Sequence, residues 1–283
     1  MKLLIASGYN PFQIGSGPGN GLYYLSKSLA ANGCEVHLFF PKTKETGELD
    51  NRIIVHYYHD ALKYTPLSES WIPFSILSIK QINQICNDYK LDGVYGRSPT
   101  TFGYAAFKTL KLPFVVSIHG TSFGEISSLY NTPLIFQNFK IIREAMITQP
   151  LWGFLTKIEY TCAHKLVAVS KSIAEEAANY YRINKDKFVI IPNGVTSLAK
   201  KCPEEEQLIL SVGRMIWRKG FIYLINAMAD VLKEFPNAKL LLVGQGTCKQ
   251  DLIQHCKNLN LQQSIFFSNN LPKGKLFELY SKS

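Results

Sequence analysis

The fold prediction starts from the segment Ser211-Val212-Gly213-Arg214-Met215-Ile216-Trp217-Arg218-Lys219-Gly220, because a strand pattern ends in it and a helix pattern follows it. Before it, residues 207–212 form an apolar run that is typical of a buried strand. After it, apolar residues recur every three or four positions from Phe221 onward, which is typical of a helix. A strand, a glycine-containing loop and a helix in this order form the repeating unit of a parallel α/β sheet.

The same unit recurs along the whole chain of 283 residues. Short apolar runs followed by segments of helical period predict strands at 2–6, 35–40, 53–57, 92–95, 113–118, 165–169, 187–191, 207–212, 239–243 and 264–268. The helices between parallel strands cover both faces of their sheet. We therefore expect an α/β protein built from two Rossmann-like, doubly wound parallel-sheet domains.

A change in composition divides the chain into these domains. Residues 196–206 carry Ser, Lys, Pro and three successive glutamates without an apolar period, so we interpret them as a linker. The N-terminal domain is then expected over 1–195 and the C-terminal domain over 207–283. Three predicted strands are fewer than the roughly five or six of a doubly wound sheet, so we expect the second domain to be incomplete.

Composition and charge exclude several classes of protein. Hydrophobic residues make up 46% and charged residues 18%, which fits a folded core rather than a disordered chain. The six cysteines include no Cys-x-x-Cys pair, which argues against a zinc site or a disulfide framework and for a reducing, cytoplasmic compartment. No run approaches the roughly 20 apolar residues of a membrane span. The net charge of +10 favours acidic partners and does not choose among phosphorylated ligands, nucleic acid and an anionic membrane.

The cations within 211–220 are the main candidates for chemistry. Gly213 allows a ligand to approach the backbone closely, Arg214 offers a planar fork of N–H donors, and Lys219 adds a compact point charge. Together they suit a diphosphate whose negative charge grows as its bond to a sugar breaks. A solvated basic loop is the alternative interpretation.

Other candidates follow predicted strands, at the edge where open α/β sheets bind ligands. His119 follows the strand at 113–118, Gly17 lies in a glycine-rich loop after the first strand, and Gly244 follows the strand at 239–243. Glu125 can orient a hydroxyl or a cation, and Asn193 lies near the predicted boundary between the domains, a common place for ligand pockets. Taken singly, each of these residues has a plain structural explanation as a turn, a capping group or an exposed loop residue.

Taken together and in this order, the motifs resemble glycosyltransferase family 4. The motifs are the glycine-rich first loop, His119-Gly120, Val169-Ser170-Lys171-Ser172, Ile191-Pro192-Asn193-Gly194-Val195, Val212-Gly213-Arg214 with Lys219-Gly220, and Val243-Gly244-Gln245-Gly246. The resemblance implies the GT-B fold of two facing Rossmann-like domains. It also implies transfer of a sugar, with retention of anomeric configuration, from a nucleotide-diphosphate sugar to a carbohydrate or lipid-linked acceptor. It implies no required metal, no bound cofactor and no nucleic-acid partner, since the nucleotide sugar is itself a substrate.

The resemblance also assigns roles to single residues. By it, Arg214 and Lys219 would hold the donor diphosphate, Gly213 and Gly244 would shape the donor pocket, and Gly17 would line the site through its backbone. His119 would contact the transferred sugar near its reacting carbon.

The sequence departs from the family pattern at three points. Ser16 stands where the family often has the first glycine of a pair, and Cys34 stands where it often has His. No two glutamates here lie eight positions apart, although the family uses such a pair to bind the ribose and sugar of the donor. We expect the pair beyond Ser283 and expect this chain to be weaker than a complete enzyme.

Alternatives remain for both activity and partner. A non-catalytic remnant that binds nucleotide or a partner enzyme is one alternative, and a nucleotide-binding oxidoreductase without its Gly-x-Gly-x-x-Gly motif is another. Ile135, Phe139, Ile142 and Met146 share one face of a predicted helix. That face can make a peripheral contact with an anionic membrane, line a lipid-like acceptor groove or pack against its own domain.

Overall fold

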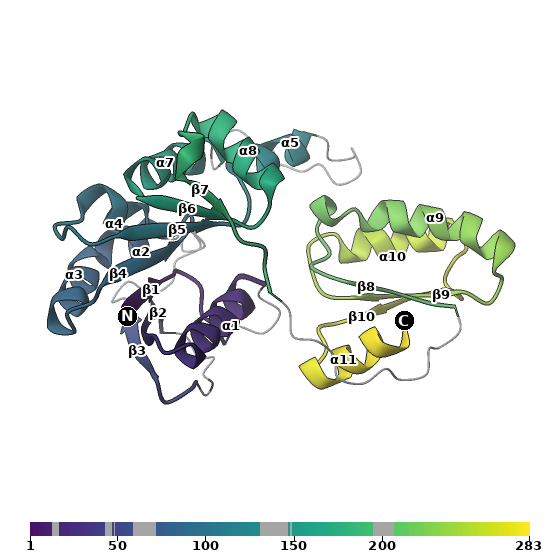
Figure 1. Ribbon diagram of the computed structural model, residues 1–283. Helices are drawn as coiled ribbons and strands as arrows, with labels where there is room; N and C mark the ends of the chain where they lie inside the picture. The colour runs from purple at the N-terminus through teal and green to yellow at the C-terminus, as the bar shows by residue number, and fades with distance from the viewer. Residues whose placement is uncertain are drawn as a thin grey trace. The chain divides into compact units, whose positions relative to one another are not determined.

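The computed structural model describes residues 1–12, 17–42, 47, 49–58, 72–130, 147, 149–194 and 207–283. Within these residues the chain forms two compact α/β units (Figure 1). The first holds the described residues of Met1–Ser127 and Arg143–Asn193, and the second holds those of Ser128–Ile142 and Gly194–Ser283. The linker expected at 196–206 and the helix expected around 135–146 lie outside the described residues, so both stay predictions.

The first unit contains a parallel sheet of seven strands in the order β3-β2-β1-β4-β5-β6-β7. The strands are β1 (Lys2–Ala6), β2 (Glu35–Pro41), β3 (Ile53–Tyr58), β4 (Gly93–Arg97), β5 (Phe114–Ile118), β6 (Lys165–Ala168) and β7 (Phe188–Ile190). Each matches a predicted strand to within two residues. The chain adds strands outward from β1 in one direction and then continues from β4 in the other, so β1 and β4 flank the point where the winding reverses.

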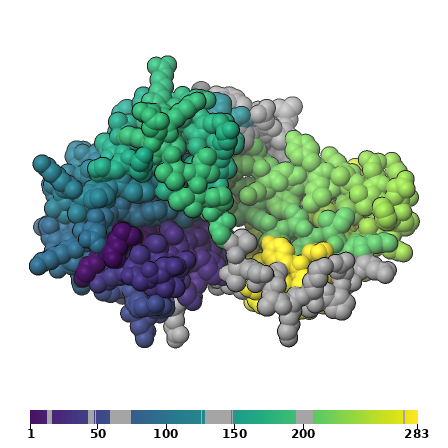
Figure 2. Space-filling model, viewed as in Figure 1, coloured from purple at the N-terminus to yellow at the C-terminus, as the bar shows by residue number. Residues whose placement is uncertain are grey.

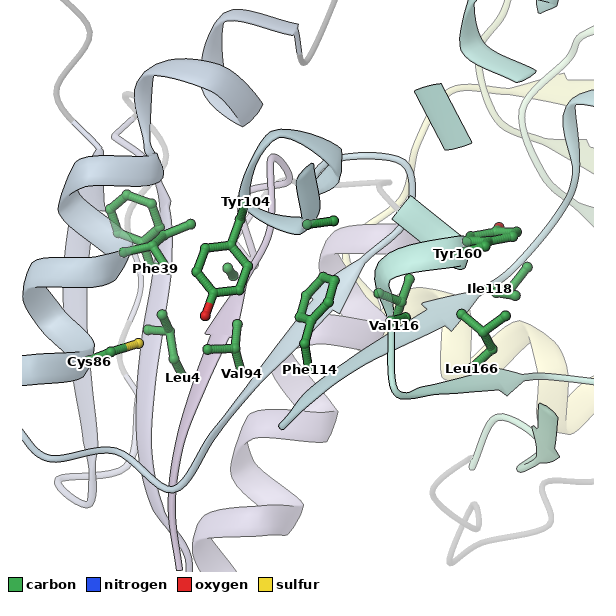
Figure 3. Packing of buried hydrophobic residues seen from close by; sticks show 14 of the residues in the cluster. Leu4, Phe39, Cys86, Val94, Tyr104, Phe114, Val116, Ile118, Tyr160 and Leu166 are labelled. Carbon is green, nitrogen blue, oxygen red and sulfur yellow. The ribbon is translucent and has the colours of Figure 1, made fainter. Parts of the chain in front are cut away.

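Helices cover both faces of this sheet. They are α1 (Gly17–Ala31), α2 (Ile72–Leu77), α3 (Ile79–Asp88), α4 (Phe102–Phe107), α5 (Ser122–Tyr130), α7 (Gln149–Cys162) and α8 (Lys171–Tyr181). Ile5 and Leu38 of the strands pack with Leu22 of α1 on one face. Their sequence neighbours point the other way and join a larger cluster with residues of α3, α4, α7 and α8, because side chains alternate along a strand (Figure 3).

Helix α1 begins earlier than the sequence suggests. The glycine-rich stretch from Gly15 to Gly21 is expected to be a loop, with the helix starting near Leu22, but α1 already starts at Gly17. Pro18 is compatible with a helical first turn because its fixed backbone angle suits the helix and its missing N–H has no partner there. The described part of the predicted loop, from Gly17 onward, is therefore the N-terminal end of a helix, in which Gly19 is buried.

The second unit contains a parallel sheet of three strands in the order β10-β9-β8. Its elements are β8 (Leu208–Val212), α9 (Phe221–Glu234), β9 (Lys239–Val243), α10 (Lys249–Asn258), β10 (Ile265–Ser268) and α11 (Lys273–Lys282). Helices α9 and α10 lie on one face of this sheet and α11 on the other (Figure 1). Its core combines Ile225 and Met228 of α9 with Leu240 and Leu242 of β9.

The surface of the first unit includes the helices α7 and α8, which lie together in the space-filling view (Figure 2). No helix in the described part of the chain is at once long and apolar enough to cross a bilayer.

A buried carboxyl group fixes the turn that follows β4. Glu159 of α7 is fully buried, and its Oε1 accepts hydrogen bonds from the backbone N–H of Thr101, at 2.9 Å, and from the Thr101 hydroxyl. The Thr100 hydroxyl donates to the carbonyl oxygen of Arg97 at 2.6 Å and tightens the same turn. Burial raises the pKa of Glu159, and the two bonds from Thr101 offset only part of that rise.

This geometry predicts that Glu159→Gln changes the pH dependence of folding. In the unfolded chain Glu159 releases its proton near its ordinary pKa, whereas the folded protein retains the proton to higher pH. Stability from this group is therefore lost as the pH rises. Glutamine keeps the acceptor for Thr101 and does not titrate, so the variant should gain stability relative to the parent chain between about pH 5 and about pH 8.

Urea unfolding of the first unit, followed by near-UV circular dichroism at both pH values, measures this effect. Glu175→Gln on α8 is the control, because that carboxylate is exposed and faces Lys171 at 3.8 Å. An unfolding difference between Glu159→Gln and the parent chain that is the same at both pH values would contradict the assignment.

Candidate active site

The loop after β8 is fixed to the second sheet by backbone hydrogen bonds and one buried anchor. The N–H of Gly213 donates to the carbonyl oxygen of Val243 at 3.0 Å, and the N–H of Met215 donates to Gln245 at 2.9 Å. The Met215 side chain is fully buried in the core with Phe221 of α9. The loops after β8 and β9 are therefore joined at the carboxyl edge of the sheet.

Two glycines allow these loops to approach each other. Gly244 has φ of +150°, and a Cβ there would overlap the carbonyl oxygen of Gly213. A Cβ at Gly246 would overlap the carbonyl oxygen of Met215. A side chain at either position would separate the loop that carries Arg214 from the loop after β9.

The cations of this loop face solvent. Arg214 and Lys219 are both exposed, and within the described ranges neither side chain forms an ion pair. A 3-10 turn, Trp217–Lys219, ends at Gly220 in the left-handed conformation with φ of 69°, and α9 begins at the next residue. Arg214 and Lys219 thus share one loop with Arg218 and the positive end of a helix, an arrangement suited to an anion.

Another lysine at this edge is used within the unit. The Nζ of Lys249 donates to the Oδ1 of Asn269 at 2.7 Å and links the start of α10 to the end of β10. Arg214 and Lys219 differ from it because they have no such contact among the residues that the structure describes.

His119 lies at the carboxyl edge of the first sheet, directly after β5. Its ring is partly buried, and the Nε2 atom is fully enclosed without a hydrogen-bond partner in the described part of the unit. Burial lowers the pKa of His119 to about 4, and the positive charge of Arg97 adds to this effect. The imidazole is therefore neutral at neutral pH and holds one N–H donor and one lone-pair acceptor.

Sequence reasoning missed Arg97. It is the last residue of β4, next to the reversal point, and only 6% of its surface is exposed. Its guanidinium carbon lies 5.9 Å from the centre of the Tyr9 ring. The available signal was a basic residue two positions after the strand predicted at 92–95, but the sequence does not show that this strand lies beside β1.

The remaining candidates are distributed as follows. Gly17 is the first residue of α1, exposed at the same sheet edge as His119, because α1 starts from the loop after β1. Asn193 is exposed at the end of the first unit, and Glu125 belongs to α5 with a side chain outside the described set. In the second unit Gly213 and Arg214 lie in the loop after β8 beside Gly244, and Lys219 lies in the same loop.

Similarity to known proteins extends over the whole chain. An uncharacterized glycosyltransferase of Methanocaldococcus jannaschii is 27% identical, and the match covers 100% of this chain and 73% of that protein. Alpha-monoglucosyldiacylglycerol synthase of Streptococcus pneumoniae is 23% identical over 74% of this chain and 49% of its own length. The structure of sucrose-phosphate synthase from Thermosynechococcus elongatus has a TM-score of 0.74 at 19% identity and covers 99% of this chain and 73% of that one.

Two family profiles divide the chain between them. The profile described as Glycosyltransferase Family 4 matches residues 15–197, and the profile described as Glycosyl transferases group 1 matches residues 196–283. The two α/β units with parallel sheets correspond to the GT-B fold of the structural relatives. Sequence motifs, fold and profile agree, and the chain belongs to glycosyltransferase family 4.

Proposed function

We propose that the chain takes part in transfer of a sugar from a nucleotide-diphosphate sugar to a carbohydrate or lipid-linked acceptor, with retention of anomeric configuration. The observation that carries this proposal is the loop of the second unit, which holds the exposed cations Arg214 and Lys219 beside the start of α9. Membership of the family supports glycosyl transfer in general.

The two cations would act on the leaving group. As the bond between the sugar and the diphosphate breaks, negative charge accumulates on the phosphate oxygens. Arg214 can bind two such oxygens through its fork, and Lys219 can follow the charge with its flexible ammonium. Because Met215 and Gly244 fix the loop before the ligand arrives, little ordering is left for the moment of reaction.

The neutral His119 would act on the sugar. An uncharged imidazole at the carboxyl edge of β5 can accept a hydrogen bond from a sugar hydroxyl or donate one to it. The neutral ring adds no positive charge at neutral pH. It therefore does not repel the positive charge that develops on the sugar ring near the reacting carbon. The roles of Gly17 and Asn193 in lining the site remain part of the proposal.

The acceptor is the less defined substrate. The name of the Streptococcus pneumoniae relative includes a glucosylated diacylglycerol, which supports a lipid-linked acceptor as one form of the proposal. In our proposal the N-terminal domain, 1–195, contacts the acceptor and the C-terminal domain, 207–283, binds the donor. We also propose that no metal is required and that the reaction takes place in the cytoplasm, with peripheral membrane contact for a lipid-linked acceptor.

The first test concerns nucleotide binding. Arg214→Met and Lys219→Met should each weaken binding of a nucleoside diphosphate by about tenfold, because each removes a charge-assisted contact to phosphate. Calorimetric titration with UDP, ADP and GDP measures the loss. Lys257→Met on α10 is the matched control, since it removes the same charge from an exposed position of the same unit. Equal affinities in all four proteins would refute the donor site.

Turnover should respond more strongly than binding to the same two substitutions. Removing a group that stabilises charge in the transition state typically costs about 10²–10³-fold in rate. Transfer and slow hydrolysis of labelled nucleotide sugars, assayed in the parent chain and both variants, give this comparison. Intact nucleotide binding without any transfer or hydrolysis in the parent chain would favour the non-catalytic alternative.

The third test concerns the role of His119. His119→Ala should lower transfer while leaving nucleoside diphosphate affinity within about twofold, because the imidazole is assigned to the sugar and not to the phosphates. Steady-state kinetics beside calorimetry separate the two quantities. A variant that loses affinity but turns over bound donor at the parent rate would assign His119 to the nucleotide instead.

The low pKa of His119 also predicts a pH effect on stability. The unfolded chain takes up a proton at His119 near pH 6.5, whereas the folded protein resists uptake until about pH 4, so this group costs stability as the pH falls through that window. His119→Gln removes the cost, and its stability relative to the parent should rise on acidification. Thermal unfolding of both proteins across this window measures the difference, and parallel pH profiles would be inconsistent with the buried neutral ring.

A further inference from the structure

The loop that carries His119 is attached at one end to the sheet and at the other end to a helix. Before His119, the carbonyl oxygen of Ile118 accepts a hydrogen bond from the N–H of Val169 at 3.4 Å. After it, no atom of the described residues lies within 4 Å of the ideal Cβ position of Gly120, and α5 begins two residues later. The position of the imidazole therefore depends on what holds the start of α5.

Helix α8 supplies the acceptors that hold the start of α5 (Figure 1). The N–H of Ser122 has no partner within its own helix, because it lies in the first turn, and it donates to the hydroxyl oxygen of Tyr181 at 3.0 Å. The Thr121 hydroxyl donates to the carboxylate of Glu176, and its oxygen accepts from the N–H of Gly124 at 3.0 Å. Two side chains of α8 thus bind the two residues that follow the His119-Gly120 pair.

Both acceptors are themselves fixed by packing. Tyr181 is 2% exposed, and its ring lies edge-on to the Tyr160 ring of α7 with centroids 5.1 Å apart. Burial raises the pKa of Tyr181, so its hydroxyl stays neutral at neutral pH. Glu176 is partly buried, and an ideal Cβ at Gly124 would lie 3.2 Å from its Oε1, so a larger residue there would press on the carboxylate. These contacts are in place before any ligand arrives.

We propose that Glu176 and Tyr181 are positioning residues, which hold the His119 imidazole at the carboxyl edge of β5 through Thr121 and Ser122. A misplacement of about 1 Å can cost about 10²-fold in rate, so a group assigned to the sugar needs such support. The effect on transfer rests on the proposed function. The effect on the surroundings of the imidazole does not, and it can be measured separately. Contacts that serve only to cap α5 would leave the ring unaffected.

NMR titration of the His119 ring protons in the full chain tests the positioning without any assay of activity. In the parent chain the ring should titrate near pH 4, because it is enclosed and lies near the charge of Arg97. Tyr181→Phe and Glu176→Met each remove one acceptor. Each should raise the midpoint by at least about one pH unit toward the ordinary histidine pKa, as the loop shifts and the ring meets water.

The same helix offers matched controls for both substitutions. Tyr180→Phe removes a hydroxyl from a residue that is 40% exposed, and Glu175→Met removes an exposed carboxylate that faces Lys171 at 3.8 Å. Both should keep the parent titration of His119. Glu176→Gln should also keep it, because the amide oxygen still accepts a hydrogen bond from Thr121.

Steady-state kinetics then connect the position of the ring to transfer. Tyr181→Phe and Glu176→Met should lower kcat about tenfold while nucleoside diphosphate affinity stays within about twofold, because the contacts to phosphate are untouched. Glu176→Gln should restore most of the rate lost in Glu176→Met. A general loss of folded protein would instead lower binding capacity and kcat together.

Each residue is judged by its own variant. A folded variant with the parent titration of His119 would overturn the role of that residue, and so would a variant that no longer folds, since its contact would then serve folding. A parent midpoint near pH 6.5 would overturn the proposal for both. A raised midpoint in a chain that transfers no sugar would support the positioning and refute the proposed function, whereas an unchanged midpoint in a chain that does transfer sugar would refute the positioning alone.

Discussion

The parallel pairing of every strand in both sheets is the constraint on which the rest of this protein depends. Parallel strands all end at the same edge, so the loops that follow them gather there although they are far apart in the sequence. In the first unit this edge collects the start of α1, Arg97 and His119. In the second it collects the loop of Arg214 and Lys219 and the glycines after β9. The chemistry of each unit is concentrated at one edge for this reason.

Charged groups in the two units differ in whether the fold supplies them with partners. Away from these edges, the charge of Lys187 is satisfied within the fold, since its Nζ donates to the carbonyl oxygens of Thr161 and Ala163 at 2.6 and 2.9 Å. At the edges, Arg97 and Arg214 form no ion pair within the described residues. The exposed Arg214 is hydrated and loses little by having no partner, whereas a buried charge such as Arg97 is costly without one.

Much of the fold was predictable because its signals are local. Each described strand follows from apolar periodicity, and the loop after β8 is visible as a strand, a glycine, three cations and a helix start. The start of α1 was not predictable in this way, because Pro and Gly at 17–21 favour a loop on average, whereas here they are helical and Gly19 is buried. Local propensity yields to tertiary contacts at such positions.

The sequence by itself therefore determined the α/β class, the family and the cations of the loop after β8, since each is encoded within a few consecutive residues. Only the tertiary structure decided which strand lies beside which, and with it the environment of Arg97. Its partners Tyr9 and Gly21 are more than 70 residues away along the chain, and whether a carboxylate meets the guanidinium depends on the order in which strands pack. Apolar periodicity indicates which residues are buried. Whether a buried charge has a partner depends on residues that are distant in the sequence, and only the packing of the fold decides which of them it meets.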